Sequence, residues 1–390
     1  MALCISFYAL RIVVHVVQHL NLFDIPGERS SAVKPVPTLG GIAIFFSFVF
    51  TSVVMLNGNE MPELIYIITP AMLIFFVGLK DDIITVPPVK KIIAQLVAAS
   101  IIIFMGKIRF TNLHGLFGIE EIGLIPGVLI TGFTIVVIIN SFNLMDGIDG
   151  LAAGLSMLAT IVFGSWFLLS GHYQYAILSF ALVGATLGFF YFNVYGKRYK
   201  IFMGDTGSLV LGTILSVLVI RFNEFNIDQT QRYAVESVPA ISFAILSYPL
   251  IDTLRVMFIR IINRRSPFSA DKNHLHHRML TLGFSHKQAT YTIIGINLLF
   301  IMFIFTMHRL GLLKLTVFIG IVGGFFFMMP AYFIRKGNLI KKDDPVQQLL
   351  IPGTTAATVR NNKRNFVKGK KKADLQVLSR QTLFQKFNLW

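Results

Sequence analysis

The sequence predicts an all-α, polytopic integral membrane protein, and three observations support this fold class. Hydrophobic residues make up 54% of the 390 residues and charged residues only 14%, whereas a soluble domain carries about 25% charged residues. The mean hydropathy is +0.69. The apolar residues fall into runs of roughly membrane length without the alternation of a β-barrel. An ordinary soluble globule and a disordered chain are both excluded.

Each helix needs about 20 mainly apolar residues to cross roughly 30 Å of hydrocarbon. We expect helices because lipid leaves no backbone group unsatisfied. The first run is the weakest, because it contains Arg11, His15 and His19. The eleven predicted spans are 2–22, 39–56, 64–80, 90–106, 123–142, 150–170, 173–192, 206–220, 238–259, 290–307 and 311–334.

The loop charges predict the orientation of these spans. With the N-terminus outside, the inner loops near 23–38, 80–90, 141–149, 193–205 and 260–289 carry more than twice as many Lys and Arg residues as the outer loops. Positive loop charge favours the cytosolic side. Eleven spans then place the C-terminus inside.

Two domains follow from composition: a membrane domain, 1–334, and a basic cytosolic tail, 335–390. The run KGKKK (368–372) in the tail resembles a nucleic-acid patch. A basic tail beside a last span is instead typical of contact with anionic lipid, so no nucleic-acid partner is expected. The single cysteine, Cys4, excludes an intrachain disulfide framework and a cysteine-based metal site.

Acidic residues gather at the inner ends of the predicted spans, where ionisable groups mark a functional site by default. Asp81 and Asp82 in GLKDDI (78–83) suit a divalent cation, or a base beside a metal. The alternative is a solvated pair with Lys80 as its counter-ion. The inner-end acids are Asp81, Asp82, Asp146, Asp149, Asp205, Asp252 and Asp271.

Two glycine-bearing segments extend this pattern. In NSFNLMDGIDGLAAG (140–154), Asp146 and Asp149 share a face on a helical turn, and Asn143 adds a neutral donor and acceptor. In IFMGDTGSLVLG (201–212), Asp205 lies at a helix start, where free amides favour a phosphate and a carboxylate suits Mg²⁺. A helix N-cap by Asp205 is the structural alternative.

The inner loop NRRSPFSADKNHLHHRML (263–280) is rich in cations and histidines. No HExxH pattern supports zinc. Arginines on both sides favour a lid that binds a diphosphate, and a pH-sensitive surface loop is the alternative. Carboxylates, phosphate-binding helix starts and a basic loop together indicate a diphosphate substrate with a divalent cation. A secondary transporter would instead carry its acids near the bilayer midplane.

Four motifs, GLKDD (78–82), NSFNLMDGIDGLAAG (140–154), FMGDTGS (202–208) and HLHHR (274–278), resemble the polyprenyl-phosphate N-acetylhexosamine-1-phosphate transferases, in their WecA/TagO-like branch. The likeness covers residues 20–335. It implies a bacterial inner-membrane enzyme with its active site on the cytosolic face. Such an enzyme transfers sugar-1-phosphate, most often GlcNAc-1-phosphate, from a UDP-N-acetylhexosamine to undecaprenyl phosphate and releases UMP. Another UDP-sugar, or UDP-MurNAc-pentapeptide, is the alternative donor.

The resemblance also assigns roles to residues. It implies Mg²⁺, with Mn²⁺ as a substitute, on Asp205, and a base or nucleophile at Asp81 with Asp82 beside it. The implied donor contacts and diphosphate-binding groups are Asn143, Asp146, Asp149, Phe202, His274, His276, His277 and Arg278. The family usually has His where this chain has Ala32, and Asn193 matches only weakly. Whether the chain acts alone or as a homodimer is left open.

Overall fold

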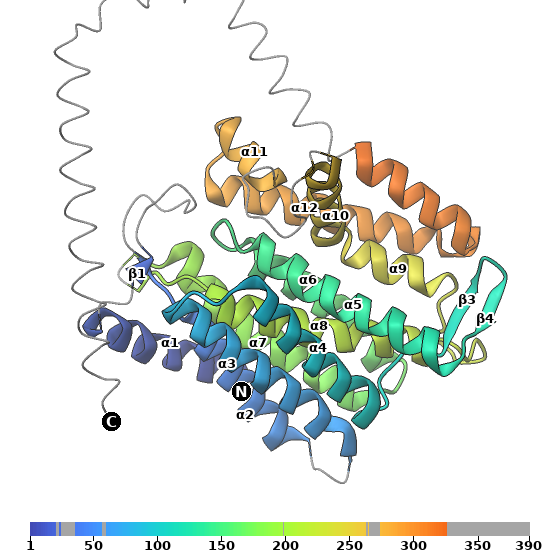
Figure 1. Cartoon of the computed structure of the whole chain (residues 1–390), viewed down its shortest axis with the longest axis horizontal. Helices are drawn as coiled ribbons and strands as arrows, with labels where there is room; N and C mark the ends of the chain where they lie inside the picture. Colours follow the sequence, from blue (N-terminus) through green and yellow to red (C-terminus); the bar gives the residue numbers. More distant parts are fainter. Residues whose placement is uncertain are drawn as a thin grey trace, which may run out of the picture. The chain divides into compact units, whose positions relative to one another are not determined.

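The computed structural model describes residues 1–20, 23–24, 36–56, 60–197, 199–262, 264 and 274–325. These residues all belong to one compact unit, Met1–Ala331. Long helices dominate it and run roughly along a common direction (Figure 1). The predicted tail, 335–390, lies outside the described residues, so the domain boundary stays a prediction.

The described elements follow one another as a chain of helices with two small ribbons. They are α1 (Ala2–His19), β1 (Phe23–Asp24), β2 (Val36–Pro37), α2 (Gly40–Met55), the 3₁₀ turn η1 (Pro62–Leu64), α3 (Ile65–Ile83), α4 (Pro88–Ser100), the π-helical turn η2 (Ile101–Met105), β3 (Asn112–Leu116), β4 (Ile119–Glu121), α5 (Leu124–Met145), α6 (Leu151–Leu169), α7 (Tyr173–Tyr195), α8 (Gly204–Phe225), α9 (Val238–Ile245), α10 (Ser247–Ile262), α11 (Leu275–Thr281), α12 (His286–Thr306) and η3 (His308–Leu310).

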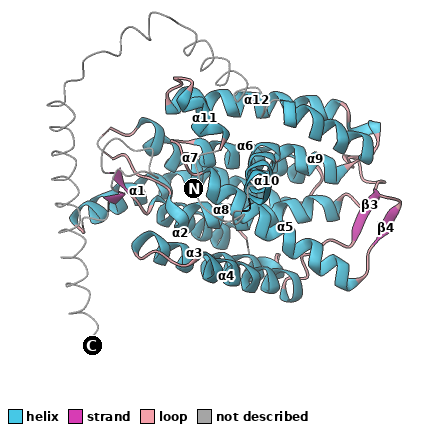
Figure 2. Cartoon of the chain, turned by 45° about the horizontal axis from the view of Figure 1, so that its top comes forward, coloured by secondary structure: helices cyan, strands magenta, loops and turns pink. Residues whose placement is uncertain are grey.

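The two ribbons are the part of the fold that an all-α prediction omits. Strands β1 and β2 pair antiparallel, as do β3 and β4. Figure 2 shows β3 and β4 as a hairpin that projects from one end of the helices. Gly115 and Gly118 in this hairpin have positive φ, at 78° and 77°, a conformation that glycine adopts without a steric penalty. The hairpin is short and local, so it does not change the helical class.

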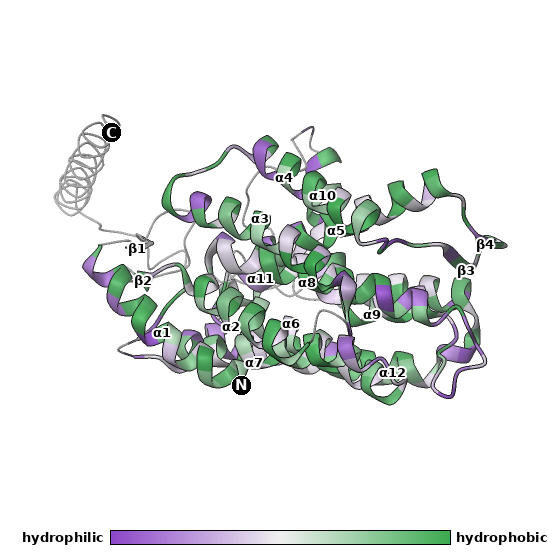
Figure 3. Cartoon of the chain, turned by 90° about the horizontal axis from the view of Figure 1, so that it is seen from below, coloured by the Kyte–Doolittle hydropathy of each residue, from purple (hydrophilic) through white to green (hydrophobic). Residues whose placement is uncertain are grey.

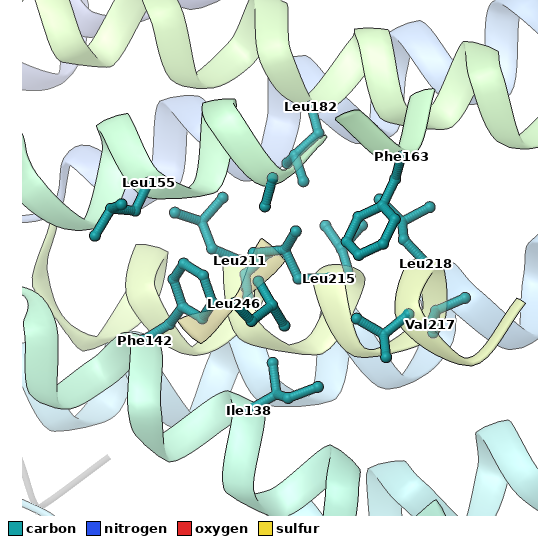
Figure 4. Close-up of a cluster of buried hydrophobic side chains, with 14 of the residues drawn as sticks. Ile138, Phe142, Leu155, Phe163, Leu182, Leu211, Leu215, Val217, Leu218 and Leu246 are labelled. Atoms are coloured by element: carbon teal, nitrogen blue, oxygen red, sulfur yellow. The ribbon is translucent and has the colours of Figure 1, made fainter. Parts of the chain in front are cut away.

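Helix α8 is the centre of the unit. Almost every residue from Thr206 to Asn223 is buried. Its leucines Leu211, Leu215 and Leu218 lie among side chains of neighbouring helices (Figure 4). Gly207 of α8 lies directly against Gly41 of α2, where a β-carbon on either residue would meet backbone or side-chain atoms. Small residues let two helix backbones approach this closely. This contact fixes the first turn of α8 against α2.

The helices are suited to a membrane. Eight of those described are long and apolar enough to cross it, and two more, α2 and Leu312–Phe325, are apolar but shorter. Hydrophobic residues cover most helix surfaces, and hydrophilic residues gather at helix ends and in loops (Figure 3). Exposed side chains such as Ile125 and Phe133 face outward and suit contact with lipid. The polytopic, helical class is confirmed, whereas the number of eleven spans is not.

The predicted span 238–259 is divided into α9 and α10 at Leu246. Pro249 explains the division, because proline has no N–H to donate to the carbonyl of Ile245. Asn297 of α12 donates to that carbonyl at 3.3 Å and accepts from the Ser247 hydroxyl at 2.8 Å. Figure 1 shows α10 nearly end-on, while α5 and α8 run across the view. Helix α10 therefore leaves the common direction of the helices.

Candidate active site

The end of α3 is joined to the start of α8 by Asp82. Its carboxylate accepts hydrogen bonds from the backbone N–H of Asp205 at 2.8 Å and of Thr206 at 3.0 Å, and from the Thr206 hydroxyl. These amides belong to the first turn of α8, whose N–H groups have no partner within the helix. Gly204, with φ of 71°, lies against the same carboxylate and leaves no room for a β-carbon. Asp82 therefore caps α8 from another helix.

Lys91 brings the two neighbouring acids together. Its Nζ lies 3.0 Å from Asp81 Oδ2 and 2.6 Å from Asp205 Oδ2. The other oxygen of Asp81 accepts from the backbone N–H of Val86 at 2.6 Å. Two carboxylates that are 124 residues apart in sequence, on α3 and α8, thus converge on one cationic atom. Residues of the first and third predicted motifs share one site.

The second motif lies beside them. Asn143 near the end of α5 donates to the Ser208 hydroxyl of α8 at 3.0 Å. Asp146 follows α5 directly. Burial, together with the negative charges of Asp205 and Asp82, raises the pKa of Asp146 to about 8. Asp146 therefore holds a proton at neutral pH, and a cation arriving at this site would favour its release.

Asp149 is held differently from Asp146, although both belong to one loop. Its Oδ2 lies 2.6 Å from Lys200 Nζ and 3.5 Å from His286 Nδ1. Burial acts to raise the pKa of Asp149, but these two partners hold it below the ordinary value for aspartate. Its carbonyl also accepts from Thr290 of α12 at 2.7 Å. Asp149 is therefore a fixed, ionised carboxylate.

Phe202 and its neighbours form the segment before α8. The Phe202 ring is partly exposed and lies 5.8 Å from Lys200 Nζ. Its backbone is fixed by β2 and the start of α2, since its N–H donates to the Pro37 carbonyl at 2.8 Å and its carbonyl accepts from the Gly40 N–H at 2.9 Å. Asn193 joins this segment to the acidic loop through Gly150 N–H, at 2.6 Å, and the Ile201 carbonyl, at 2.8 Å. An accessible aromatic ring thus lies beside the Asp149–Lys200 pair.

The histidines approach the acidic loop from α11. The rings of His274 and His276 are stacked with 5.6 Å between their centroids, and His277 lies 4.4 Å from His276. His276 Nε2 lies against the α-carbon of Gly147. Burial and the neighbouring His277 lower the pKa of His276 to about 3, so this ring is neutral. Neither of its ring nitrogens has a hydrogen-bond partner in the described part of the chain.

The histidine motif therefore reaches the carboxylate motifs, as the sequence predicts. His274 is nearly buried, and its Nδ1 lies 2.9 Å from Asp252 of α10. Arg278 lies one turn into α11, and its N–H donates to the His274 carbonyl at 3.2 Å. The other predicted cations of this loop, Arg265 and Lys272, lie outside the described residues, as does Ala32.

Sequence reasoning assigned no site role to four residues: Lys91, Lys200 and His286, which hold the acids, and Asp252, which holds His274. Lys91 and Lys200 appeared only as charges that orient the protein. Pro88 begins α4 soon after α3 ends, which brings Lys90 and Lys91 near Asp81, but nothing local selects Lys91. Asp252 belongs to the predicted inner-end acids, but its contact with His274, like that of His286 with Asp149, forms only through the tertiary fold.

An apolar cavity of about 290 Å³ lies farther along α5. Its walls come from α5, α8, α9, α10 and the segment around β3, and they are almost entirely apolar. Residues that line it include Phe133, Val137, Phe243, Leu250 and Leu254. Leu250 and Leu254 lie on the same helix as Asp252, so one helix borders both this cavity and the histidines.

The donor set suits a divalent cation that is shared with a substrate. Within the described residues, no group of three or more His, Cys, Asp or Glu side chains is arranged to hold a metal. Two carboxylate oxygens, of Asp81 and Asp205, do converge on the Lys91 nitrogen. Mg²⁺ usually takes one or two carboxylates and completes its shell with water and phosphate oxygens. The residues therefore fit Mg²⁺ together with a phosphate ligand.

Comparisons with known proteins identify the family of the chain. Residues 64–223 match the model of glycosyl transferase family 4. The chain is 31% identical over 278 residues to the undecaprenyl-phosphate alpha-N-acetylglucosaminyl 1-phosphate transferase of Escherichia coli K12, covering 70% of this chain and 73% of that protein. It is 34% identical over 296 residues to the decaprenyl-phosphate N-acetylglucosaminephosphotransferase of Mycolicibacterium smegmatis, covering 69% and 71%. The acidic motifs lie inside the matched residues, and the histidines follow them.

Proposed function

Because the chain belongs to the family of polyprenyl-phosphate N-acetylhexosamine-1-phosphate transferases, we propose that it transfers GlcNAc-1-phosphate from UDP-GlcNAc to undecaprenyl phosphate and releases UMP. It is a multi-pass membrane enzyme, and the alternative of a secondary transporter is therefore set aside. We place it in the bacterial inner membrane with its active site facing the cytosol, on the basis of the loop charges. The observation that carries the proposal is the convergence of Asp81 and Asp205 on Lys91.

The proposed donor site lies at the acidic loop. The partly exposed ring of Phe202 offers a stacking surface for uracil, and Lys200 beside it offers a cation for the diphosphate. Asn143, Asp146 and Asp149 border the same space and offer acceptors for sugar and ribose hydroxyls. His276 reaches it from the other side with two ring nitrogens that lack partners among the described residues. A buried polar group without a partner is costly, so a ligand oxygen here would be stabilising.

The proposed acceptor site lies at Asp81, with the lipid chain in the apolar cavity. The cavity walls are hydrocarbon, as a polyprenyl chain requires. The phosphate of the acceptor is assigned to Asp81 and Lys91. Lys91 can neutralise part of that phosphate charge, while Asp81 can orient the phosphate or accept a proton from it. The second pKa of a phosphate monoester is about 6, so much of the acceptor is already dianionic at neutral pH.

Transfer exchanges one phosphorus–oxygen bond for another. An oxygen of the lipid phosphate attacks the phosphorus that bears the sugar, and the bond from that phosphorus to the UMP oxygen breaks. UMP leaves with the bonding electron pair. Mg²⁺, held by Asp205, would supply charge neutralisation for the donor diphosphate. Lys91 and Lys200 would share that task, since repulsion between the two anions is the main barrier to their approach. The histidines would contribute hydrogen bonds.

A donor screen tests this proposal. Purified protein is incubated with undecaprenyl phosphate, Mg²⁺ and one radiolabelled donor at a time: UDP-GlcNAc, UDP-GalNAc or UDP-MurNAc-pentapeptide. We expect label in the lipid extract with UDP-GlcNAc, equimolar UMP, and loss of both in EDTA with recovery on Mg²⁺ or Mn²⁺. Asp205→Asn should lower the rate about 1,000-fold, as expected when a charge-stabilising group is removed.

The matched control is Asp228→Asn, which changes an exposed acid far from the site. Its rate should equal that of the unmodified protein. Transfer from UDP-MurNAc-pentapeptide alone would assign the muramoyl donor instead. Full activity in EDTA would remove the metal from the proposal, and no lipid-linked product from any donor would overturn it.

A further inference from the structure

Asp252 is a buried acid that the proposed mechanism does not use. It lies on α10 with no exposed surface. One carboxylate oxygen accepts from the Arg255 guanidinium at 2.8 Å and from the backbone N–H of Leu275 at 3.1 Å, and the other lies 2.9 Å from His274 Nδ1. Each of these three partners is a donor, and two of them, His274 and Leu275, belong to the histidine segment.

The contact fixes which nitrogen of His274 carries a hydrogen. An aspartate that is paired with a guanidinium has no hydrogen of its own to give, so His274 Nδ1 must donate. A carboxylate that holds one ring nitrogen in this way sets the tautomer and the direction of the ring. The other nitrogen, Nε2, is then left as an acceptor, and it has no hydrogen-bond partner in the described part of the chain.

The same contact holds the whole histidine row in place. Helix α11 begins at Leu275, whose N–H is bound by Asp252. His274 stacks on His276, with 12° between the ring planes, and His276 lies against Gly147 of the acidic loop. A displacement of His274 would therefore move the ring that reaches the loop. The order from α10 inward is Asp252, His274, His276 and the acidic loop.

We propose that Asp252 is a positioning residue, which directs His274 and the stacked His276 onto the donor diphosphate without touching the substrate. This inference rests on the proposed function, since it assumes that the histidines bind a diphosphate. A carboxylate placed behind a functional histidine typically changes activity about 10- to 100-fold when it is replaced. A purely structural anchor would lower the amount of folded protein and leave the turnover of each folded molecule unchanged.

The test compares Asp252→Asn with Ser247→Ala in detergent. Ser247→Ala weakens the start of the same helix by removing its contact with Asn297, and it lies away from the histidines. We expect Asp252→Asn to lower kcat about 10- to 100-fold with KM for the donor unchanged within about threefold. Ser247→Ala should lower the thermal midpoint and leave kcat unchanged. Equal kcat values for Asp252→Asn and the unmodified enzyme would overturn the inference.

A double-mutant cycle and a spectrum complete the test. If Asp252 acts through His274, adding Asp252→Asn to His274→Gln should cost no more than about twofold, whereas independent roles would multiply the losses. Without any substrate, ¹⁵N-histidine spectra should show His274 with hydrogen on Nδ1, and Asp252→Asn should alter that signal. If the donor screen fails although the unmodified protein shows this His274 signal, the proposed function is overturned. If the His274 signal is the same in Asp252→Asn as in the unmodified protein, the positioning role is overturned.

Discussion

Helices α3 and α8 are joined at both ends, and the two junctions differ in their charge balance. At one end, Asp81 and Asp205 pair with Lys91, Asp82 binds the first turn of α8, and burial together with the charges of Asp205 and Asp82 raises the pKa of Asp146. At the other end, Arg221 pairs with Glu63. The two ends lie about 24 Å apart, at 1.5 Å per residue along α8.

The junction at Arg221 is closed on itself. Arg221 also donates from Nε to the Tyr175 hydroxyl at 2.8 Å, and that hydroxyl donates to Glu63 at 2.6 Å. Nearby, Glu224 accepts from the backbone and hydroxyl of Thr111 at 2.8 and 2.7 Å. Each named charge has an opposite charge or a donor opposite it. Such an arrangement supplies structure and leaves little for a ligand to satisfy.

The junction at Lys91 is not balanced. Four carboxyl groups gather there around one lysine, which pairs with only two of them, and one of the four is driven to hold a proton. The ring nitrogens of the nearby neutral His276 have no hydrogen-bond partner among the described residues. A site of this kind becomes more stable when it receives cations together with phosphate oxygens. The candidate active site at Lys91 therefore differs from the structural junction at Arg221 by its excess of negative charge, more than by the burial of its charged groups.

The largest effect should follow from Lys91→Met. This change leaves Asp81 and Asp205 facing each other without a cation, so we expect kcat/KM to fall at least about 100-fold, the scale for loss of one charge-stabilising group. Initial rates of lipid-linked product measure it. Lys91→Arg is the matched control and should retain more activity than Lys91→Met. Unchanged turnover of Lys91→Met would show that the junction at Lys91, like the one at Arg221, has only a structural role.

A smaller effect should distinguish Asp149, which is paired with Lys200, from Asp81, which is paired with Lys91. Asp149→Asn removes the charge beside Lys200 and Phe202, so we expect KM for the donor to rise about tenfold with a modest change in kcat. Asp81→Asn should instead lower kcat with little change in donor KM. Steady-state kinetics in both substrates distinguish them. If both variants change kcat and donor KM in the same way, Asp149 does not serve the donor and Asp81 the acceptor as proposed.

The closed junction should affect stability alone. Glu63→Gln leaves the Arg221 charge without its partner in a partly buried position, which costs about 1–3 kcal/mol and should lower the thermal midpoint by a few degrees. The rate of each folded molecule should stay within about twofold of the unmodified enzyme. A large loss of kcat at normal stability would show that this end takes part in catalysis.

The smallest effect should come from the tail. Truncation after residue 342 removes most cations of the predicted basic tail, to which no part in transfer is assigned, so transfer in detergent should continue at the unmodified rate. Weaker association with vesicles that contain anionic lipid is the expected consequence. A flotation assay measures that association. Complete loss of transfer at normal expression would assign the tail a part in the chemistry.

Much of the fold and of the site follows from local sequence. Apolar runs predict helices such as α5 and α8 to within a few residues, because each run must be satisfied within itself in lipid. The carboxylates of three motifs were predicted to meet, since loop charges place their helix ends on one side. Asp82 shows the limit, because only the structure shows that its oxygens cap α8.

The remaining features depend on contacts between distant segments. Nothing local distinguishes Lys91 from Lys90, yet only Lys91 forms the two ion pairs, because its side chain leaves α4 on the face toward α3. The division of span 238–259 has a local cause in Pro249, but the direction of α10 depends on Asn297 in another helix. Periodicity carries no information about such partners, so these features require the tertiary structure.

The junction between α9 and α10 makes two positions, 48 residues apart, interdependent. Pro249 leaves the Ile245 carbonyl without its helical donor, and the Asn297 amide supplies a substitute. Replacing Asn297 should therefore cost more stability while residue 249 is proline, because the Ile245 carbonyl then loses its substitute donor. With an ordinary residue at 249, only the contact with the Ser247 hydroxyl would be lost. If positions 249 and 297 are substituted one after the other, the order therefore decides how much stability the single variant loses. Engineering that exchanges α12 between relatives has to carry both positions together.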